Sequence, residues 1–128
     1  MFDSEYCNVQ YNMEDKVVLL TWKKFCSGQN YRNPVNYSLK LFNSKKVSIY
    51  VVDARNGFED EKADVDWVCT EFLPKMANTY CKTVVFIMEA VNNIEGEMDM
   101  WTKKFLEYFR VLRVTSYEDA LEQLQCDL

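Results

Sequence analysis

Two apolar runs with strand character constrain the fold of this chain most. They are VSIYVVD, over residues 47–53, and KTVVFIM, over residues 82–88. Both contain β-branched and aromatic residues and are apolar over most of their length, which is typical of a strand covered on both faces of its sheet. Such strands run parallel, and a parallel connection needs about a dozen residues or more, usually a helix. The chain is therefore predicted to contain a mainly parallel sheet with connecting helices.

The segments around these runs continue the alternation of strands and helices. EYCNVQYN and DKVVLLTW, separated by the short turn signal MED, predict an N-terminal β-hairpin. Asn33 suits a helix N-cap and Pro34 the first helical position, so a helix is expected to begin there. Pro74 is expected to kink or restart the next helix, and Ser116 with Asp119 forms a capping box at the start of the last one. Helices are predicted over about 33–43, 62–77, 96–109 and 116–124, and a further strand over 110–115.

This order of elements predicts one domain over residues 1–128. Its fold class is α/β, with a mixed, mostly parallel sheet of about five strands, an N-terminal β-hairpin and about four helices. A chain of this length buries roughly two-thirds of its unfolded surface, so it needs no disulfide or metal ion to fold.

The charge balance argues against a general nucleic-acid binder. The chain has 20 acidic and 15 basic residues, a net charge of −5. Its lysine pairs, at 23–24, 45–46 and 103–104, lie between acidic stretches, whereas nucleic-acid binders show a basic patch or stripe. No apolar run approaches the ~20 residues that span a bilayer, and the N-terminus shows no secretory signal. We expect a cytoplasmic protein with no nucleic-acid partner and no membrane insertion.

Several residue types that common sites require are missing. The chain has no histidine, and its five cysteines show no C-x-x-C spacing. Zinc fingers and histidine-based triads are therefore excluded or disfavoured. Each of the three glycines is isolated, which rules out a P-loop or Rossmann fingerprint. The cysteines are interpreted as reduced, small core residues, with Cys126 the most exposed. No catalytic residue, metal site or cofactor is predicted.

A set of short motifs is similar to those of a known family. The motifs are VLLTW (18–22), VVDAR (51–55), the spacing of Trp67 and Pro74, TVVFI (83–87), MDMW (98–101) and VTSYEDALEQL (114–124). Over about residues 5–125 the chain resembles the SpoIIAA-like family. These proteins are bacterial relatives of the STAS fold (sulfate transporter and anti-sigma-factor antagonist) and are also compared with the lipid-binding Sec14 domain. The resemblance implies a small cytoplasmic α/β domain with no established enzymatic activity.

One departure from that family concerns its regulatory serine. In anti-sigma-factor antagonists a phosphorylatable serine begins the helix after the central strand, but the matching stretch here, EDEKADVDWVC, has none. Asp64 and Asp66 lie near this helix start instead, so the phosphorylation switch is not carried over. Carboxylates there stabilise a helix N-terminus by about 0.3–1 kcal/mol each. We favour this role over mimicry of a phosphate, and we expect these carboxylates on a solvated face rather than in catalysis.

Polar residues follow two of the predicted strands. In open α/β sheets, ligands bind at the carboxyl ends of the strands. The side chains expected at this rim are Asp53, Arg55 and Asn56 after one strand, and Glu89, Asn92 and Asn93 after the next. The favoured interpretation is that Asp53 and Arg55 pair with each other or cap local amides. The alternative is that the rim binds a small polar ligand.

Trp67 is the other candidate binding residue. With the buried stripe of its helix centred on Val65 and Phe72, Trp67 lies about 200° from Val65 at 100° per residue. A tryptophan on a polar face is a candidate anchor for a partner or for self-association. The favoured interpretation, however, is that the loop over 55–61, with Phe58, folds over it. Trp22 and Trp101 are interpreted as core residues.

The leading hypothesis from these observations is a non-catalytic regulatory or protein-interaction module of the SpoIIAA-like type, including a possible homodimer. Its contact surface would be the junction over 53–67 and the helix that follows. The first alternative is a domain that binds a small ligand, a polar metabolite or a lipid, at the strand-end rim. The last alternative is an enzyme.

Overall fold

The computed structural model describes residues 1–57, 61–88 and 95–126. This part of the chain is an α/β fold around a six-stranded mixed sheet with strand order β1-β2-β3-β4-β5-β6. The strands are β1 (Phe2–Asp3), β2 (Cys7–Asn12), β3 (Val17–Trp22), β4 (Ile49–Asp53), β5 (Thr83–Ile87) and β6 (Arg110–Val114). The helices are α1 (Gln29–Ser44), the continuous run α2 (Lys62–Trp67), η1 (Val68–Phe72) and α3 (Leu73–Ala77), then α4 (Glu95–Leu106) and α5 (Tyr117–Cys126). The prediction of about five strands missed β1, whose two residues carry no recognisable strand pattern.

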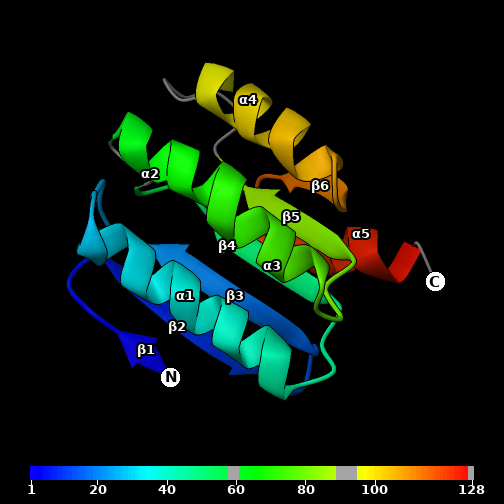
Figure 1. The fold of residues 1–128 in the computed structure, drawn as a ribbon. Helices are drawn as coiled ribbons and strands as arrows, with labels where there is room; N and C mark the ends of the chain where they lie inside the picture. Colours follow the sequence, from blue (N-terminus) through cyan, green and yellow to red (C-terminus); the bar gives the residue numbers. More distant parts are fainter. Residues whose placement is uncertain (58–60, 89–94, 127–128) are drawn as a thin grey trace.

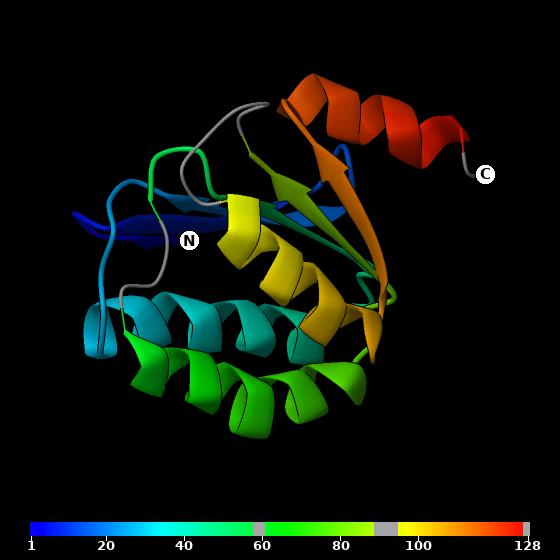
Figure 2. The same cartoon turned by 90° about the horizontal axis from the view of Figure 1, so that it is seen from above.

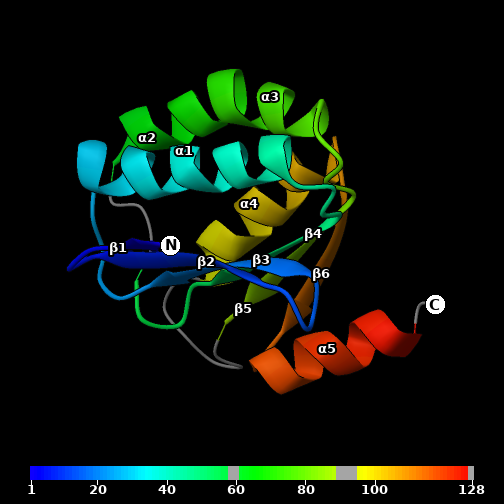
Figure 3. The same cartoon turned by 90° about the horizontal axis from the view of Figure 1, so that it is seen from below.

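The sheet is antiparallel at its first strands and parallel beyond them. The predicted hairpin is confirmed, since β2 and β3 pair antiparallel from Cys7↔Trp22 to Asn12↔Val17. The strands β3, β4, β5 and β6 then pair parallel in sequence order. Right-handed crossovers between successive parallel neighbours place the connecting helices on one face of a sheet. Figures 1 and 3 show α1, α2, α3 and α4 on one face and α5 on the other.

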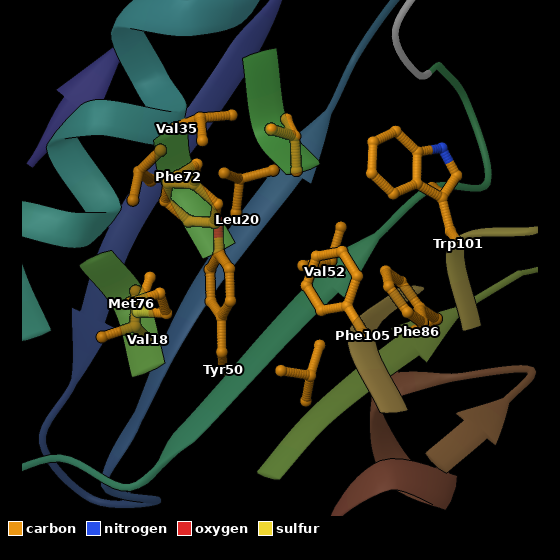
Figure 4. Packing of buried hydrophobic residues seen from close by; sticks show 14 of the residues in the cluster. Val18, Leu20, Val35, Tyr50, Val52, Phe72, Met76, Phe86, Trp101 and Phe105 are labelled. Carbon is orange, nitrogen blue, oxygen red and sulfur yellow. The ribbon is translucent and has the colours of Figure 1, made fainter. Parts of the chain in front are cut away.

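The main core lies between the sheet and the helices of the first face. Figure 4 shows Leu20, Tyr50 and Phe86 of the strands close to side chains of the helices, among them Phe72 and Phe105. Phe86 and Phe105 make an edge contact at 5.1 Å between ring centroids. A smaller apolar cluster, on the opposite face under α5, contains Val17, Val51, Val85, Ile87, Val114 and Ala120.

The two tryptophans predicted as core residues are confirmed in the core. Trp22 and Trp101 are 2% and 1% exposed. The ring of Trp22 stacks on Tyr31 of α1 at 5.0 Å between centroids. This contact joins the end of β3 to the beginning of α1.

The predicted start of α1 was wrong. The helix begins at Gln29, so Asn33 is not its N-cap and Pro34 lies inside it. Gly28 stands at the N-cap position with φ 61°, in a backbone region that glycine enters without steric cost. A contact with the helix start of α2, described below, holds this residue.

The predicted effect of Pro74 is confirmed as a change of helical hydrogen bonding. The Leu73 N–H donates to the carbonyl of Val68, five residues earlier, and α3 begins at Leu73. Proline has no N–H and its ring crowds the carbonyl four residues before it. The wider π-turn therefore precedes the proline, and the helical run continues to Ala77.

The capping interaction predicted for α5 is present. The Asp119 N–H donates to Ser116 Oγ at 3.1 Å, and the Asp119 carboxylate accepts a hydrogen bond from Thr115 at 2.8 Å. In the part of the chain that the structure describes, no helix combines the length and the apolar character needed to cross a membrane.

Three cysteine side chains lie in the interior, as predicted. Cys7, Cys26 and Cys81 are buried and, like the half-buried Cys69, form no disulfide. Burial raises the pKa of Cys81 to about 12 and also raises the pKa of Cys7. Both thiols are therefore protonated at neutral pH. The side chain of Cys126 lies outside the described part.

Candidate functional site

The rim predicted at the carboxyl ends of the strands is described in part. Asp53 ends β4, and Arg55 and Asn56 follow it on the exposed connection to α2. Glu89, Asn92 and Asn93, predicted for the same rim, lie outside the described residues. Phe58, the predicted cover of Trp67, lies outside them as well.

Asp53 and Arg55 form a closed ion pair, as the favoured interpretation predicted. The Arg55 Nε donates to Asp53 Oδ1 at 3.0 Å, and its terminal nitrogen donates to Oδ2 at 2.7 Å. The Arg55 backbone N–H donates to the same Oδ1 at 3.1 Å. Both oxygens of this buried carboxylate are engaged within the loop, so a ligand here would share Asp53 with Arg55.

Asp64 is buried, which corrects the prediction of a solvated carboxylate. It is only 2% exposed, because its side chain faces α1 rather than water. Its Oδ2 accepts the Gly28 N–H at 2.9 Å and its Oδ1 accepts Arg32 Nε at 2.8 Å. Asp64 therefore ties the start of α1 to the start of α2. The exposed Asp66 does match the prediction.

Trp67 lies beside α1, not on the side of its helix opposite the buried face. The buried positions of this run begin at Asp64 and Val68 rather than at the half-buried Val65, so the predicted centre was displaced. The Trp67 ring meets Tyr31 edge-on at 6.4 Å and stacks on Phe72 at 6.2 Å. The contact with Phe72, five residues later, fits a π-turn, which brings such positions onto one side.

Arg32 joins the tryptophan to the buried carboxylate. Its guanidinium carbon lies 5.2 Å from the centre of the Trp67 ring, within the range of a cation–π contact. The same guanidinium donates to Asp64 and, at 3.4 Å, to the carbonyl of Ala63. The half-buried tryptophan is thus held in place by a fixed cation on the neighbouring helix.

A groove of about 340 Å³ borders Trp67 on the helical face. The lining side chains are Asn36 of α1 and Trp67, Glu71, Phe72 and Lys75 of the α2–η1–α3 run. Glu71 and Lys75 are exposed and lie 3.9 Å apart. We call this the Trp67 groove. Figure 2 shows α1 and the α2–η1–α3 run lying side by side along their whole length.

A second open hollow, of about 380 Å³, lies on the other flank of α1 beside β1. Phe2 and Tyr37, whose ring centroids are 5.7 Å apart, border it together with the amides of Asn33, Asn36 and Asn43. Asn36 lines both this hollow and the Trp67 groove, so α1 is accessible on both sides.

The described interior has little room for a lipid chain. A cavity among aromatic core residues such as Trp22, Tyr50 and Phe105 has a volume of only about 30 Å³, about the share of one water molecule. Its floor includes Tyr50, whose hydroxyl pairs with Ser38 at 2.8 Å. Among these residues there is no cavity large enough for a lipid, which the lipid form of the ligand-binding alternative would require.

Sequence reasoning found Trp67 and Asp64 but missed Tyr31, Arg32 and Asn36. These three residues come from α1, which the chain places beside the later helix only through the fold. The one available signal was Gly28, an isolated glycine before a helix whose start was assigned too late.

Comparison with protein-family models finds no match to this chain, and comparison with curated proteins finds no match either.

Proposed function

We propose that the chain is a non-catalytic regulatory or protein-interaction module of the SpoIIAA-like type, which binds a partner protein at the Trp67 groove. The observation that carries the proposal is a half-buried tryptophan bordering an open groove between two helices. Tryptophan is the residue type most enriched among anchors of protein interfaces, where it fills a pocket surrounded by weaker contacts.

The surroundings of Trp67 support its use as an anchor. Its ring is fixed by Tyr31, Phe72 and Arg32, and Arg32 is itself fixed by the buried Asp64. A side chain already held in one position loses little freedom on binding, which favours affinity. The exposed Glu71 and Lys75 at the border supply a polar rim.

The position of Asp64 supports regulation without the phosphorylation switch. At the helix start where anti-sigma-factor antagonists have their serine, this chain has a buried carboxylate that already holds Gly28 and Arg32. A permanent charge with internal partners gives a fixed structure. On this proposal, partner binding is controlled by something other than a phosphate at this helix.

The proposal is tested by native mass spectrometry of the protein purified gently from its own host. A co-purifying protein chain is expected with the natural sequence and is expected to be lost with Trp67→Ala, by roughly thirtyfold or more in affinity for an interface anchor. Phe25→Ala removes another exposed aromatic ring, outside the groove, and should leave binding unchanged.

Trp67→Ala also removes ring contacts with Tyr31 and Phe72, so a second variant is needed that changes the groove without changing this packing. Glu71→Lys changes an exposed side chain at the border of the groove and also removes its exposed pair with Lys75, which contributes little to stability. It is expected to weaken binding while the unfolding midpoint changes little. Retention of the partner by both Trp67→Ala and Glu71→Lys would overturn the proposed site. A bound small molecule in place of a protein would favour the ligand-binding alternative.

A further inference from the structure

The amino ends of the parallel strands carry a row of cationic and aromatic side chains. The C-termini of α1, α3 and α4 arrive at the same end of the sheet, where β4, β5 and β6 begin (Figures 1 and 2). We call the exposed side chains of the loops and strand starts there the amino-end row: Lys46, Tyr80, Lys82, Tyr108 and Arg110.

Backbone hydrogen bonds show that members of the row are neighbours. The Lys82 N–H donates to the Ser48 carbonyl at 2.8 Å, and the Arg110 N–H donates to the Lys82 carbonyl at 3.0 Å. The Lys46 ammonium lies 6.0 Å from the centre of the Tyr80 ring. These contacts cross from β4 to β5 to β6, so residues distant in sequence form one surface.

The lysines of this row are available to a partner. Among the residues that the structure describes, neither Lys46 nor Lys82 forms an ion pair, although both are exposed. The rings of Tyr80 and Tyr108 are also exposed, by 53% and 43%. Within the row itself the charged side chains are all cations. Nearby carboxylates at this end are Glu107, next to the row in sequence, and Glu14 and Asp15 of the β2–β3 turn, which lie beside Ile49 at the start of β4.

The helix dipole explains the lysines near the row but not the residues of the row itself. Lys75 lies in the last turn of α3, and Lys103 and Lys104 lie in the last turn of α4, where cations complement the helix dipole. Lys82 belongs to no helix, and neither do the two tyrosines. A contribution to helix stability therefore does not explain why these three side chains are exposed.

We propose that the amino-end row binds an acidic segment of a partner protein. Carboxylates of the segment would pair with Lys46 and Lys82, and its carbon chains would cover the exposed rings of Tyr80 and Tyr108. Charge complementarity carries this assignment, because the row is cationic in a chain whose net charge is −5. The same net charge repels a long polyanion such as nucleic acid more strongly than a short acidic segment, which favours a short polypeptide segment.

This inference goes beyond the Trp67 groove, since it uses none of the residues that line the groove. A direct test measures the fluorescence anisotropy of a short labelled polyglutamate peptide titrated with the full chain. Saturable binding that weakens at high salt is expected, because the attraction is between exposed charges. Lys82→Glu and Lys46→Glu are each expected to weaken it by about tenfold, since a reversed charge replaces attraction by repulsion.

The matched control is Lys62→Glu, the same charge change on an exposed lysine at the start of α2, away from the row. It should leave the affinity within about twofold, and each variant is checked for an unchanged unfolding midpoint. Equal binding by Lys62→Glu and Lys82→Glu would overturn the proposal. Tighter binding of oligothymidylate than of polyglutamate at the same lysines would overturn the choice of a polypeptide partner.

Discussion

The two ends of the parallel strands differ in which of their charged side chains form ion pairs within the chain. At the carboxyl ends, five cations form ion pairs within the chain, namely Lys23, Lys24, Arg32, Arg55 and Arg113, while the exposed Lys62 at the start of α2 forms none among the described residues. At the amino ends, Lys46 and Lys82 have no ion-pair partner in the described residues. The comparison teaches that charged residues at the end where α/β proteins usually bind ligands act here largely as structural ties. The proposed partner site uses lysines at the other end that form no ion pair in the described residues.

The largest expected effect is at Gly57, where two loops of the carboxyl end meet. A Cβ atom at this position would lie 2.1 Å from the carbonyl oxygen of Lys24. Because backbone meets backbone there, Gly57→Ala must separate the loops after β3 and β4. We expect a loss of at least about 3 kcal/mol in the free energy of unfolding, measured by urea denaturation. The exposed neighbour Asn56→Ala should cost less than about 0.5 kcal/mol, and equal effects would contradict close packing at this end.

The next effect concerns the buried carboxylate of the carboxyl end. Asp64→Asn leaves Arg32 without its charged partner and weakens the acceptor for the Gly28 N–H. Removal of one member of a buried pair is expected to cost about 2–3 kcal/mol, with Arg32 partly exposed to water. Asp66→Asn, two residues later and exposed, is the control and should cost almost nothing. Similar urea midpoints for the two variants would show that Asp64 is not a structural tie.

The two ends of the sheet are expected to lose stability alike at high pH, because a buried cysteine thiol lies near each end. Cys7 pairs with Trp22 at the carboxyl end, and Cys81 precedes β5 at the amino end. Burial raises the pKa of Cys81 from 9.0 to about 12, so the folded chain holds this proton more tightly. The stability that the neutral thiol contributes is complete below pH 9.0 and is lost as the pH rises from 9.0 to about 12.

At pH 10 this loss amounts to about 1.4 kcal/mol for Cys81. Urea denaturation at pH 7.5 and pH 10 measures it, and Cys81→Ala removes this part of the pH dependence while other groups still titrate. An identical decrease in stability with and without the Cys81 thiol would show that the group titrates normally in the fold.

The sequence was sufficient for features whose cause is local. The hairpin from Cys7 to Trp22, the two buried strands and the Ser116 cap all follow from alternation, β-branched runs and capping chemistry. The features that sequence reasoning missed depend on contacts between distant segments. The start of α1 depends on Asp64, and the placement of Trp67 depends on Arg32 and on a π-turn.

The candidate surfaces follow the same division. Trp67 was recognisable because a tryptophan among polar residues is unusual, but the lining of its groove comes from two helices. From the sequence, the pair Lys45–Lys46 is interpreted as isolated charges between acidic stretches, and Lys82 only as the first residue of a buried strand. Only the parallel register, in which Ile49 pairs with Thr83 and Thr83 with Arg110, brings the starts of three strands together.

The smallest expected effect is also the most direct test of the comparison. Lys23→Glu breaks an exposed pair with Asp3, whose pKa is lowered by its hydrogen bond with Lys23. We expect a small loss of stability, well below that of Asp64→Asn, which shrinks as salt screens the charges. Lys82→Glu removes an unbalanced cation and should leave stability unchanged or slightly increased, because it relieves repulsion within the row. Since both changes replace an exposed lysine by glutamate, a matching loss in the two variants at low salt would show that both ends are equally paired, and the case for a partner at the amino ends would fail with it.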